Sequence, residues 1–270
     1  AITKQNILAA NYPFATIEPN VGVVIVPDER LDFLNDLYKP KSLVPTAFEF
    51  TDIAGLVKGA SNGEGLGNKF LSHIREVDAI CEVVRCFEDT NVTHVEGGVD
   101  PVRDIEIINI ELILADLEVV ENRLNRIGKK AIMSKDKETL KEVELLTKIK
   151  ESLLKNQAIR RLELDEDEIM LSKAFNFLTQ KPIIYMANIS ELDLANNGNK
   201  YVDMVREYAK EEGAEVVVVC AKIESELAEL PEEDKMLFLE DLGIKTSGLD
   251  QLIQATYSLL GLATYFTAGS

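Results

Sequence analysis

The sequence predicts an α/β fold, with a doubly wound, mostly parallel sheet and an inserted antiparallel α-helical hairpin. Three short runs, at 79–87, 182–187 and 215–219, are almost continuously apolar, as is typical of strands that helices cover on both faces. Helical patterns alternate with the strands, at 66–77, 200–212 and 248–262. This alternation of strand and helix indicates the doubly wound sheet.

Two further β-branched runs, at 21–26 and 47–51, are predicted strands that precede this series. The second of them ends directly before Asp52-Ile53-Ala54-Gly55 and a glycine-rich loop at 58–67. A carboxylate at the end of a strand can reach the shell of a Mg²⁺ ion, usually through a water. The N–H of Gly55 can approach a terminal phosphate because no Cβ is in the way. Taken alone, the same four residues also fit an ordinary turn between a strand and a loop.

The region from about Asp104 to Phe175 departs from the α/β alternation and predicts the helical hairpin. Apolar residues recur there at spacings of three and four in two series, with a polar segment at 128–136 between them. The two series are Ile110, Leu114, Leu117, Val120, Leu124 and Ile127, then Leu140, Val143, Leu146, Ile149 and Leu153.

The predicted tip of this hairpin is basic, and its basic residues are Arg123, Arg126, Lys129, Lys130, Lys135 and Lys137. Two interpretations stay open. The tip is either a solvated helix end or a contact for RNA or a protein partner on an otherwise acidic chain.

The composition narrows the function class. The chain has 270 residues, 46% of them hydrophobic, and a net charge of −18, which argues against non-specific nucleic-acid or membrane binding by the surface as a whole. No apolar run is long enough to span a bilayer, and no His/Cys group has zinc spacing. The three cysteines lie on hydrophobic runs, so we expect reduced, buried thiols in a cytoplasmic protein.

Four segments of the chain carry polar groups that together suit a nucleotide site on the predicted sheet. Open α/β sheets bind ligands at the carboxyl ends of their strands. Here those ends carry the Asp52 loop, Asn188-Ile189-Ser190-Glu191 and Cys220-Ala221-Lys222, and a proline-containing loop at 12–20 supplies Thr16, a hydroxyl able to ligate Mg²⁺. Four features in this order are far more specific for a nucleotide site than any one of them.

The motifs Y-P-F-x-T-I-E-P-N at 12–20, D-I-A-G-L-V-K-G-A-S-x-G-E-G-L-G-N-x-F-L at 52–71, V-R-C-F-E at 84–88 and N-x-x-E at 188–191 stand in this order. This order resembles the YchF subfamily of Obg-related P-loop NTPases, the Obg-like ATPases. The resemblance implies a P-loop NTPase-type sheet in a nucleotide-binding G-type domain at 1–103 and 176–270. It also implies a helical coiled-coil insertion at 104–175.

The family begins with a strand and a G-x-x-x-x-G-K-[ST] phosphate loop, and this motif does not occur in the 270 residues. The family's C-terminal TGS domain would follow the last residues. We therefore expect the chain to be a central fragment of a longer protein, without the N-terminal phosphate loop and the TGS domain. A chain that began at Ala1 would bind nucleotide very weakly, because the groups that cradle the phosphates would be missing.

The resemblance assigns roles to the phosphate side of the site. It implies that Thr16 and Asp52 hold Mg²⁺ and that Gly55 contacts the γ-phosphate. Leu56 stands where many GTPases carry the Gln that orients the attacking water, and a leucine side chain cannot hold a water. His94 matches a family histidine that is considered a substitute water-positioning group, although a lone loop histidine is more usually a solvated residue.

The base side departs from the guanine-reading N-K-x-D motif, because Ile189 replaces Lys and Glu191 replaces Asp. Asn188 and the backbone near Ile189 can read the N6 amino group of adenine, while Lys222 covers the base and Ala221 offers its N–H. A turn after a strand is the plain alternative. The resemblance likewise implies that ATP is preferred over GTP.

We therefore expect a Mg²⁺-dependent ATPase with weak or residual GTPase activity that acts as a ribosome-associated regulatory switch. Its expected partner is the large ribosomal subunit or ribosomal RNA, contacted through the hairpin tip, with no membrane and no DNA partner. The alternative is a ribosome- or RNA-binding module in which hydrolysis is incidental.

Overall fold

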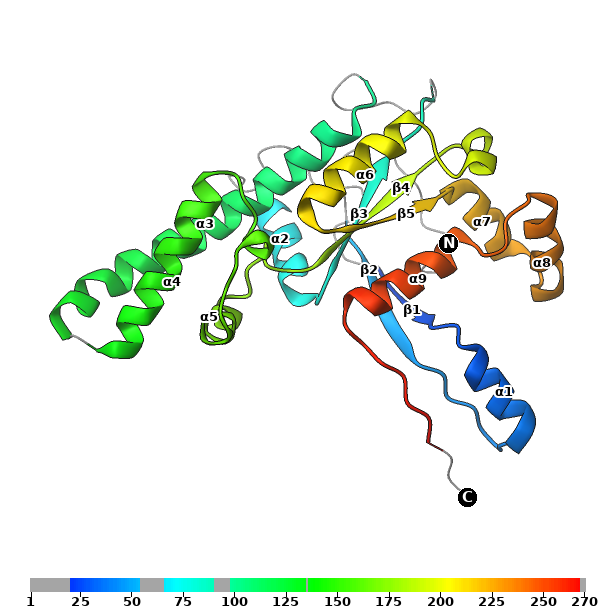
Figure 1. The fold of residues 1–270 in the computed structure, drawn as a ribbon, viewed down its shortest axis with the longest axis horizontal. Helices are drawn as coiled ribbons and strands as arrows, with labels where there is room; N and C mark the ends of the chain where they lie inside the picture. Colours follow the sequence, from blue (N-terminus) through cyan, green and yellow to red (C-terminus); the bar gives the residue numbers. More distant parts are fainter. Residues whose placement is uncertain (1–19, 54–65, 90–97, 135, 268–270) are drawn as a thin grey trace. The chain divides into compact units, whose positions relative to one another are not determined.

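The computed structural model describes residues 20–53, 66–89, 98–134 and 136–267 (Figure 1). The chain divides into two compact units. The first unit comprises residues 1–53, 81–102 and 183–270, and the second comprises 54–80 and 103–182. The domain boundaries inferred from the sequence, 1–103 with 176–270 and 104–175, stay a prediction.

A parallel sheet forms the centre of the first unit, and its strands are β3 (Ile80–Arg85), β4 (Ile183–Asn188) and β5 (Glu215–Val219), in the order β3-β4-β5. β4 and β5 pair in parallel from Ile184 beside Glu215 to Asn188 beside Val219. β3 is parallel to β4, since Ile80 N–H donates to the Pro182 carbonyl (3.0 Å) and Cys86 N–H donates to the Asn188 carbonyl (2.8 Å). The predicted α/β class with its parallel sheet is confirmed.

Helices cover both faces of this sheet. Tyr185 of β4 stacks edge-on against Tyr208 of α6 (Lys200–Glu212), with ring centroids 6.1 Å apart. Its neighbours Ile184 and Met186 point to the other face, where they pack with Leu252 of α9 (Gly248–Leu259). Successive residues of a strand point to opposite faces, so the apolar run of β4 is explained by this double cover.

Three further helices of the first unit, α1 (Glu29–Tyr38), α7 (Ala221–Glu229) and α8 (Glu232–Asp241), were not predicted from the sequence. The predicted helix at 200–212 matches α6, and the predicted helix at 248–262 ends three residues early, at Leu259.

The first unit also contains a two-stranded antiparallel sheet, formed by β1 (Asn20–Ile25) and β2 (Ala47–Asp52) and connected through α1 (Glu29–Tyr38). Its register runs from Asn20 beside Asp52 to Ile25 beside Ala47. Val24 and Val26 are buried against Ile253 of α9. This packing defines the buried face of the two-stranded sheet. Asp52 is the last residue of β2.

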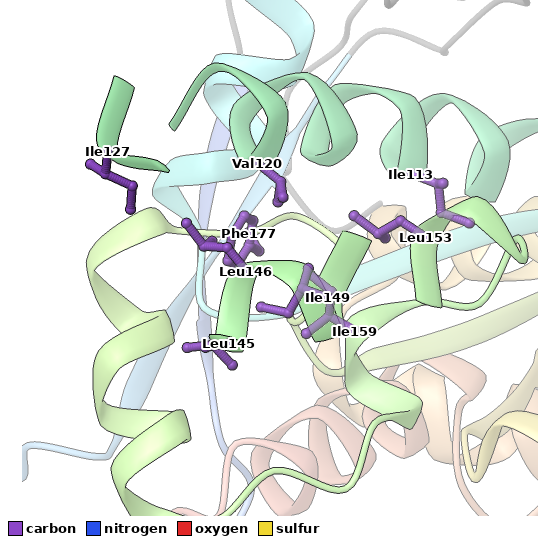
Figure 2. Packing of buried hydrophobic residues seen from close by; sticks show 9 residues of the cluster. All are labelled: Ile113, Val120, Ile127, Leu145, Leu146, Ile149, Leu153, Ile159 and Phe177. Carbon is purple, nitrogen blue, oxygen red and sulfur yellow. The ribbon is translucent and has the colours of Figure 1, made fainter. Parts of the chain in front are cut away.

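The second unit contains the predicted helical hairpin, made of α3 (Pro101–Ser134) and α4 (Lys137–Leu154). Figure 2 shows their shared core, which joins residues of both helices to Ile159 and Phe177. The core residues on α3 and α4 are Ile113, Val120, Ile127, Leu145, Leu146, Ile149 and Leu153. Ion pairs Arg123–Glu142 and Lys150–Glu121 cross between the helices in antiparallel order.

The turn of the hairpin lies later than the sequence predicted. The polar segment 128–136 was expected to separate the helices, but α3 continues to Ser134 and α4 begins at Lys137. The lysines, alanine and methionine in this segment favour helix despite their polarity. The actual stop is marked by Asp136, whose carboxylate accepts the Thr139 N–H (3.1 Å) as the N-cap of α4.

Asp116 of α3 is a buried carboxylate that joins separate parts of the second unit. Its oxygens accept the N–H groups of Leu178 (2.9 Å) and Thr179 (2.8 Å) and the Thr179 hydroxyl (2.8 Å), and Arg75 of α2 (Leu66–Glu76) lies 3.6 Å away. Burial raises the pKa of Asp116, and the hydrogen bonds from Thr179 and Leu178 oppose that rise. The carboxylate thus ties α2, α3 and the 178–179 segment together.

A lysine completes this junction at the end of α2. Lys181 Nζ donates to the carbonyls of Arg75 (3.0 Å) and Val77 (2.6 Å), which lie at and just beyond the carboxyl end of the helix. A cation at this end satisfies carbonyls that have no partner within the helix. α2 is therefore held by the buried carboxylate of Asp116 on α3 and by the capping ammonium of Lys181, which follows α5 (Glu166–Ser172).

Candidate functional site

The carboxyl ends of β4 and β5 bring the predicted base-reading residues together. Asn188 ends β4 beside Val219, the last residue of β5. Its side-chain Oδ1 accepts the Ala221 N–H at 3.0 Å. Because a carbonyl oxygen has two lone pairs, Oδ1 can accept one further hydrogen bond, such as one from an amino group.

Ile189 contributes backbone rather than side chain to this site. Its side chain is buried, with 2% of the residue exposed, and its N–H donates to the Val219 carbonyl at 2.9 Å. The apolar side chain at this position therefore anchors the segment in the core. This explains why an isoleucine suits a place where guanine-reading sites carry a lysine.

Glu191 and Lys222 form an ion pair between the two loops. Lys222 Nζ donates to Glu191 Oε2 at 2.7 Å. The Lys222 side chain is 65% exposed and the Glu191 side chain is 43% exposed. The hydrogen bond to Glu191 raises the pKa of Lys222. The pair faces solvent at the edge of the site, and its apolar stems and charged ends are available to a planar ligand.

The first turn of α7 is fixed by a buried glutamate. Glu224 Oε1 accepts the Gly248 N–H (2.7 Å) at the start of α9. A Cβ on Gly248 would lie 3.2 Å from Glu224 Oε1 and from the Val218 carbonyl oxygen, so the close approach favours glycine. Burial raises the pKa of Glu224 against the hydrogen bonds from Gly248 and Leu249. This contact anchors the helix that begins with Ala221 and Lys222.

The family model for 50S ribosome-binding GTPases matches residues 1–123. The ribosome-binding ATPase YchF of Bacillus subtilis (strain 168) is 62% identical over all of this chain, which covers 74% of that protein. The chain belongs to the YchF family. The ribosome-binding ATPase YchF of Escherichia coli O157:H7 is 51% identical over the whole chain, which covers 73% of it. Both matches cover the full chain and therefore include both the sheet and the hairpin.

The fold agrees with a solved YchF structure. The Schizosaccharomyces pombe YchF GTPase superposes with a TM-score of 0.83 at 40% identity, over 99% of this chain and 73% of that one. The fold is therefore that of a P-loop NTPase, as the YchF resemblance implied.

The predicted phosphate-side residues of this YchF chain are placed only in part. Asp52 is exposed at the end of β2, on the two-stranded sheet. Thr16, Gly55 and His94 lie outside the described residues, as does Leu56. An exposed carboxylate has the donor chemistry that Mg²⁺ prefers, so Asp52 fits the predicted role. Within the ranges that the structure describes, no group of three or more His, Cys, Asp or Glu residues could hold a metal ion.

The hairpin tip is likewise placed in part. Arg123 donates to Glu142 through Nη2 (3.0 Å), whereas Arg126 and Lys137 are exposed. Lys135 and the side chains of Lys129 and Lys130 lie outside the described part of the structure. Across the described ranges, no helix combines the length and apolar character needed to cross a lipid bilayer.

Sequence reasoning missed the residues that support the Asn188–Glu191 segment in this YchF chain. Ser190 donates to Asp193 (2.6 Å), and Asn199 donates to Asp193 (2.9 Å) and to the Cys86 carbonyl (2.7 Å). The run Asn196-Asn197-Gly198-Asn199 was the available signal, since asparagine and glycine favour turns with positive φ and asparagine caps helices.

Proposed function

We propose that this chain is the nucleotide-binding part of a Mg²⁺-dependent ATPase that prefers ATP to GTP and acts as a ribosome-associated switch. The observation that carries the proposal is the paired arrangement at the strand ends, with Asn188 bound to Ala221 and Glu191 bound to Lys222. The relatives are named ribosome-binding ATPases, which supports the proposal. Their association with ribosomes also supports a cytoplasmic location.

Base choice follows from the way Glu191 is held. A guanine-reading aspartate accepts hydrogen bonds from two donors of the base, N1 and N2. Glu191 is one methylene longer and its Oε2 already accepts from Lys222 at 2.7 Å, so guanine would have to share this carboxylate with an ion pair. Adenine needs only an acceptor for its N6 amino group, and Asn188 Oδ1 has a lone pair to offer. Adenine is therefore the better fit.

Calorimetric titration tests this base choice. The sample is the natural-length protein, that is, the full gene product that contains these 270 residues. We expect ATP to bind at least about tenfold more tightly than GTP, the difference of roughly one well-made hydrogen bond. Equal affinity or a GTP preference would contradict the ATP assignment. No binding of either nucleotide would reject the proposed function as a whole.

The phosphate side of the proposed site rests on Asp52, Thr16 and Gly55. When bound, Mg²⁺ neutralises charge on the phosphate oxygens. Asp52 and Thr16 supply the oxygen ligands or hold the waters of its shell, and the Gly55 N–H donates to the terminal phosphate. Leu56 can neither donate to nor accept from the attacking water, so that task falls to another group. We assign it to His94, as a neutral imidazole.

Replacing His94 by alanine should lower kcat for ATP hydrolysis about a hundredfold and leave ATP affinity unchanged, because the imidazole orients only the attacking water. Single-turnover hydrolysis and equilibrium binding, measured side by side, separate the two effects. The His73→Gln variant, on α2, is the matched control and should keep wild-type turnover. If His94→Ala hydrolyses ATP at the wild-type rate, His94 has no part in the chemistry.

A second candidate function is ribosome or RNA binding in which hydrolysis is incidental. It is favoured by the basic tip of the hairpin on a chain whose net charge is −18. α3 has 34 residues and therefore extends about 50 Å. A long, stiff hairpin with a basic end is suited to reach a phosphate-rich surface.

A further inference from the structure

Asn199 uses its whole side-chain amide to join segments that are distant in the sequence. Its Nδ2 donates to the Cys86 carbonyl (2.7 Å) after β3 and to Asp193 Oδ2 (2.9 Å) in the loop after β4. Its Oδ1 accepts the N–H groups of Tyr201 (2.9 Å) and Val202 (3.2 Å) and so caps α6. One side chain thus serves as helix cap and as tether.

Asp193 is the centre of the loop that Asn199 holds. Its Oδ2 also accepts the Ser190 hydroxyl (2.6 Å), its N–H donates to the Ser190 carbonyl (3.2 Å), and its carbonyl accepts the Gly198 N–H (3.2 Å). These bonds shape the 3₁₀ turn Glu191–Asn196, which begins with the predicted base-reading carboxylate. The position of Glu191 therefore depends on Asp193.

Gly198 allows the chain to make this connection. Its φ is +135°, a conformation that residues with a side chain rarely adopt. A Cβ there would also lie 3.1 Å from the Cβ of Val202. The glycine lets the backbone turn back and place Asn199 between Cys86 and Asp193.

The tether acts on the loop rather than on the strand. The end of β3 is held independently, because the Cys86 N–H donates to the Asn188 carbonyl at 2.8 Å. Likewise, Ile189 is held by Val219 at 2.9 Å. Beyond Ile189, the loop is linked back to the end of β3 through Asp193 and Asn199 to the Cys86 carbonyl, and Glu191 is separately paired with Lys222 of α7. Loss of Asn199 would therefore loosen the segment that carries Glu191 and leave the strands in place.

We propose that Asn199 is a positioning residue that fixes the Asn188–Glu191 segment, through Asp193 and Ser190, and thereby sets the discrimination between adenine and guanine nucleotides. This inference rests on the proposed nucleotide site and adds a residue that acts on base choice without touching the base.

The Asn199→Asp variant distinguishes the two roles of Asn199, the tether through Nδ2 and the N-cap of α6 through Oδ1. An aspartate keeps an acceptor oxygen for the α6 N-cap but has no amide donor, and its charge faces the Asp193 carboxylate and the Cys86 carbonyl. In the natural-length protein we expect ATP affinity to fall about tenfold and the preference for ATP over GTP to fall about tenfold. We expect kcat at saturating ATP to stay within about twofold of wild type.

Two further variants control this result. Asp193→Ala removes the acceptor of the tether on the loop and should reproduce the loss of affinity and selectivity. Asp136→Ala removes the N-cap of α4 in the other unit, which is a loss of helix capping comparable to that at α6. This variant should leave ATP affinity and selectivity unchanged. A fall in kcat and thermal stability for Asn199→Asp with unchanged selectivity would reduce Asn199 to a structural residue and overturn the inference.

Amide hydrogen exchange measures how firmly Asn199 holds the loop, and it does so in the absence of nucleotide. In Asn199→Asp, amides of residues 190–198 should exchange faster, while amides of β3 and β4 keep their protection. If the wild-type protein binds no nucleotide, the proposed function fails and this measurement still reports on the tether. Unchanged exchange at 190–198 would overturn the inference in either case.

Discussion

The Asp116→Ala variant should be less stable than the wild-type protein by about 3–5 kcal/mol in the unit formed by 54–80 and 103–182. The carboxylate is fully buried and accepts three hydrogen bonds from Leu178 and Thr179, both of which are also buried. Alanine leaves these donors without a partner and without access to water. It also leaves the guanidinium of Arg75 without its anion, 3.6 Å away.

Urea unfolding, followed by circular dichroism, measures this loss. The matched control is Asp167→Ala, which removes an exposed ion pair to Lys141 in the same unit and should cost less than about 1 kcal/mol. Asp116→Asn preserves the volume but offers a single acceptor oxygen, so its loss should fall between the two. Equal stability for Asp116→Ala and Asp167→Ala would show that the buried carboxylate holds nothing together.

Charge reversal at the hairpin tip should weaken ribosome binding. We expect the triple variant Lys129→Glu, Lys130→Glu and Lys135→Glu to weaken ribosome association at least about tenfold, because each lysine that contacts a phosphate releases counterions. ATP hydrolysis should continue at the wild-type rate, since the tip lies far along the sequence from the nucleotide motifs. Co-sedimentation with ribosomes at two salt concentrations measures the affinity and its salt dependence.

A control triple variant makes the same change in net charge at positions outside the hairpin tip. The exposed residues Lys41, Lys210 and Lys245 serve this purpose when each is replaced by glutamate. This variant should sediment with ribosomes as wild type does. If the tip variant also sediments normally, the basic residues are a solvated helix end, and the second candidate function loses its support.

The strands were predictable from the sequence because each is a short run rich in β-branched or aromatic residues. β5 matches its predicted range, and the other strands differ by one or two residues at their ends. The residues of β4 are buried on both faces, so periodicity was not needed to recognise it. The helical hairpin was predictable for a different reason, since spacings of three and four persist over many turns in both helices.

α7 and α8 were missed because neither has a strong signal of its own. The N-cap residue of α7, Cys220, makes no side-chain capping hydrogen bond, and α8 leaves Met236 and Leu237 exposed. Short helices of this kind are stabilised by what they pack against, such as the Glu224 contact to Gly248 in α7. Only the tertiary structure supplies those partners.

The sequence by itself determined the α/β class, the helical hairpin and the YchF family, and it predicts the segments 188–191 and 220–222 as the base side of a nucleotide site. These follow from local periodicity and from motif order, which do not depend on distant contacts. The tertiary structure alone decided which groups meet. Asn188 reaches Ala221 over 33 residues, Asp116 reaches Leu178 over 62, and Asn199 reaches Cys86 over 113. A buried polar group finds its partner through the packing of whole elements, and no local pattern encodes that meeting.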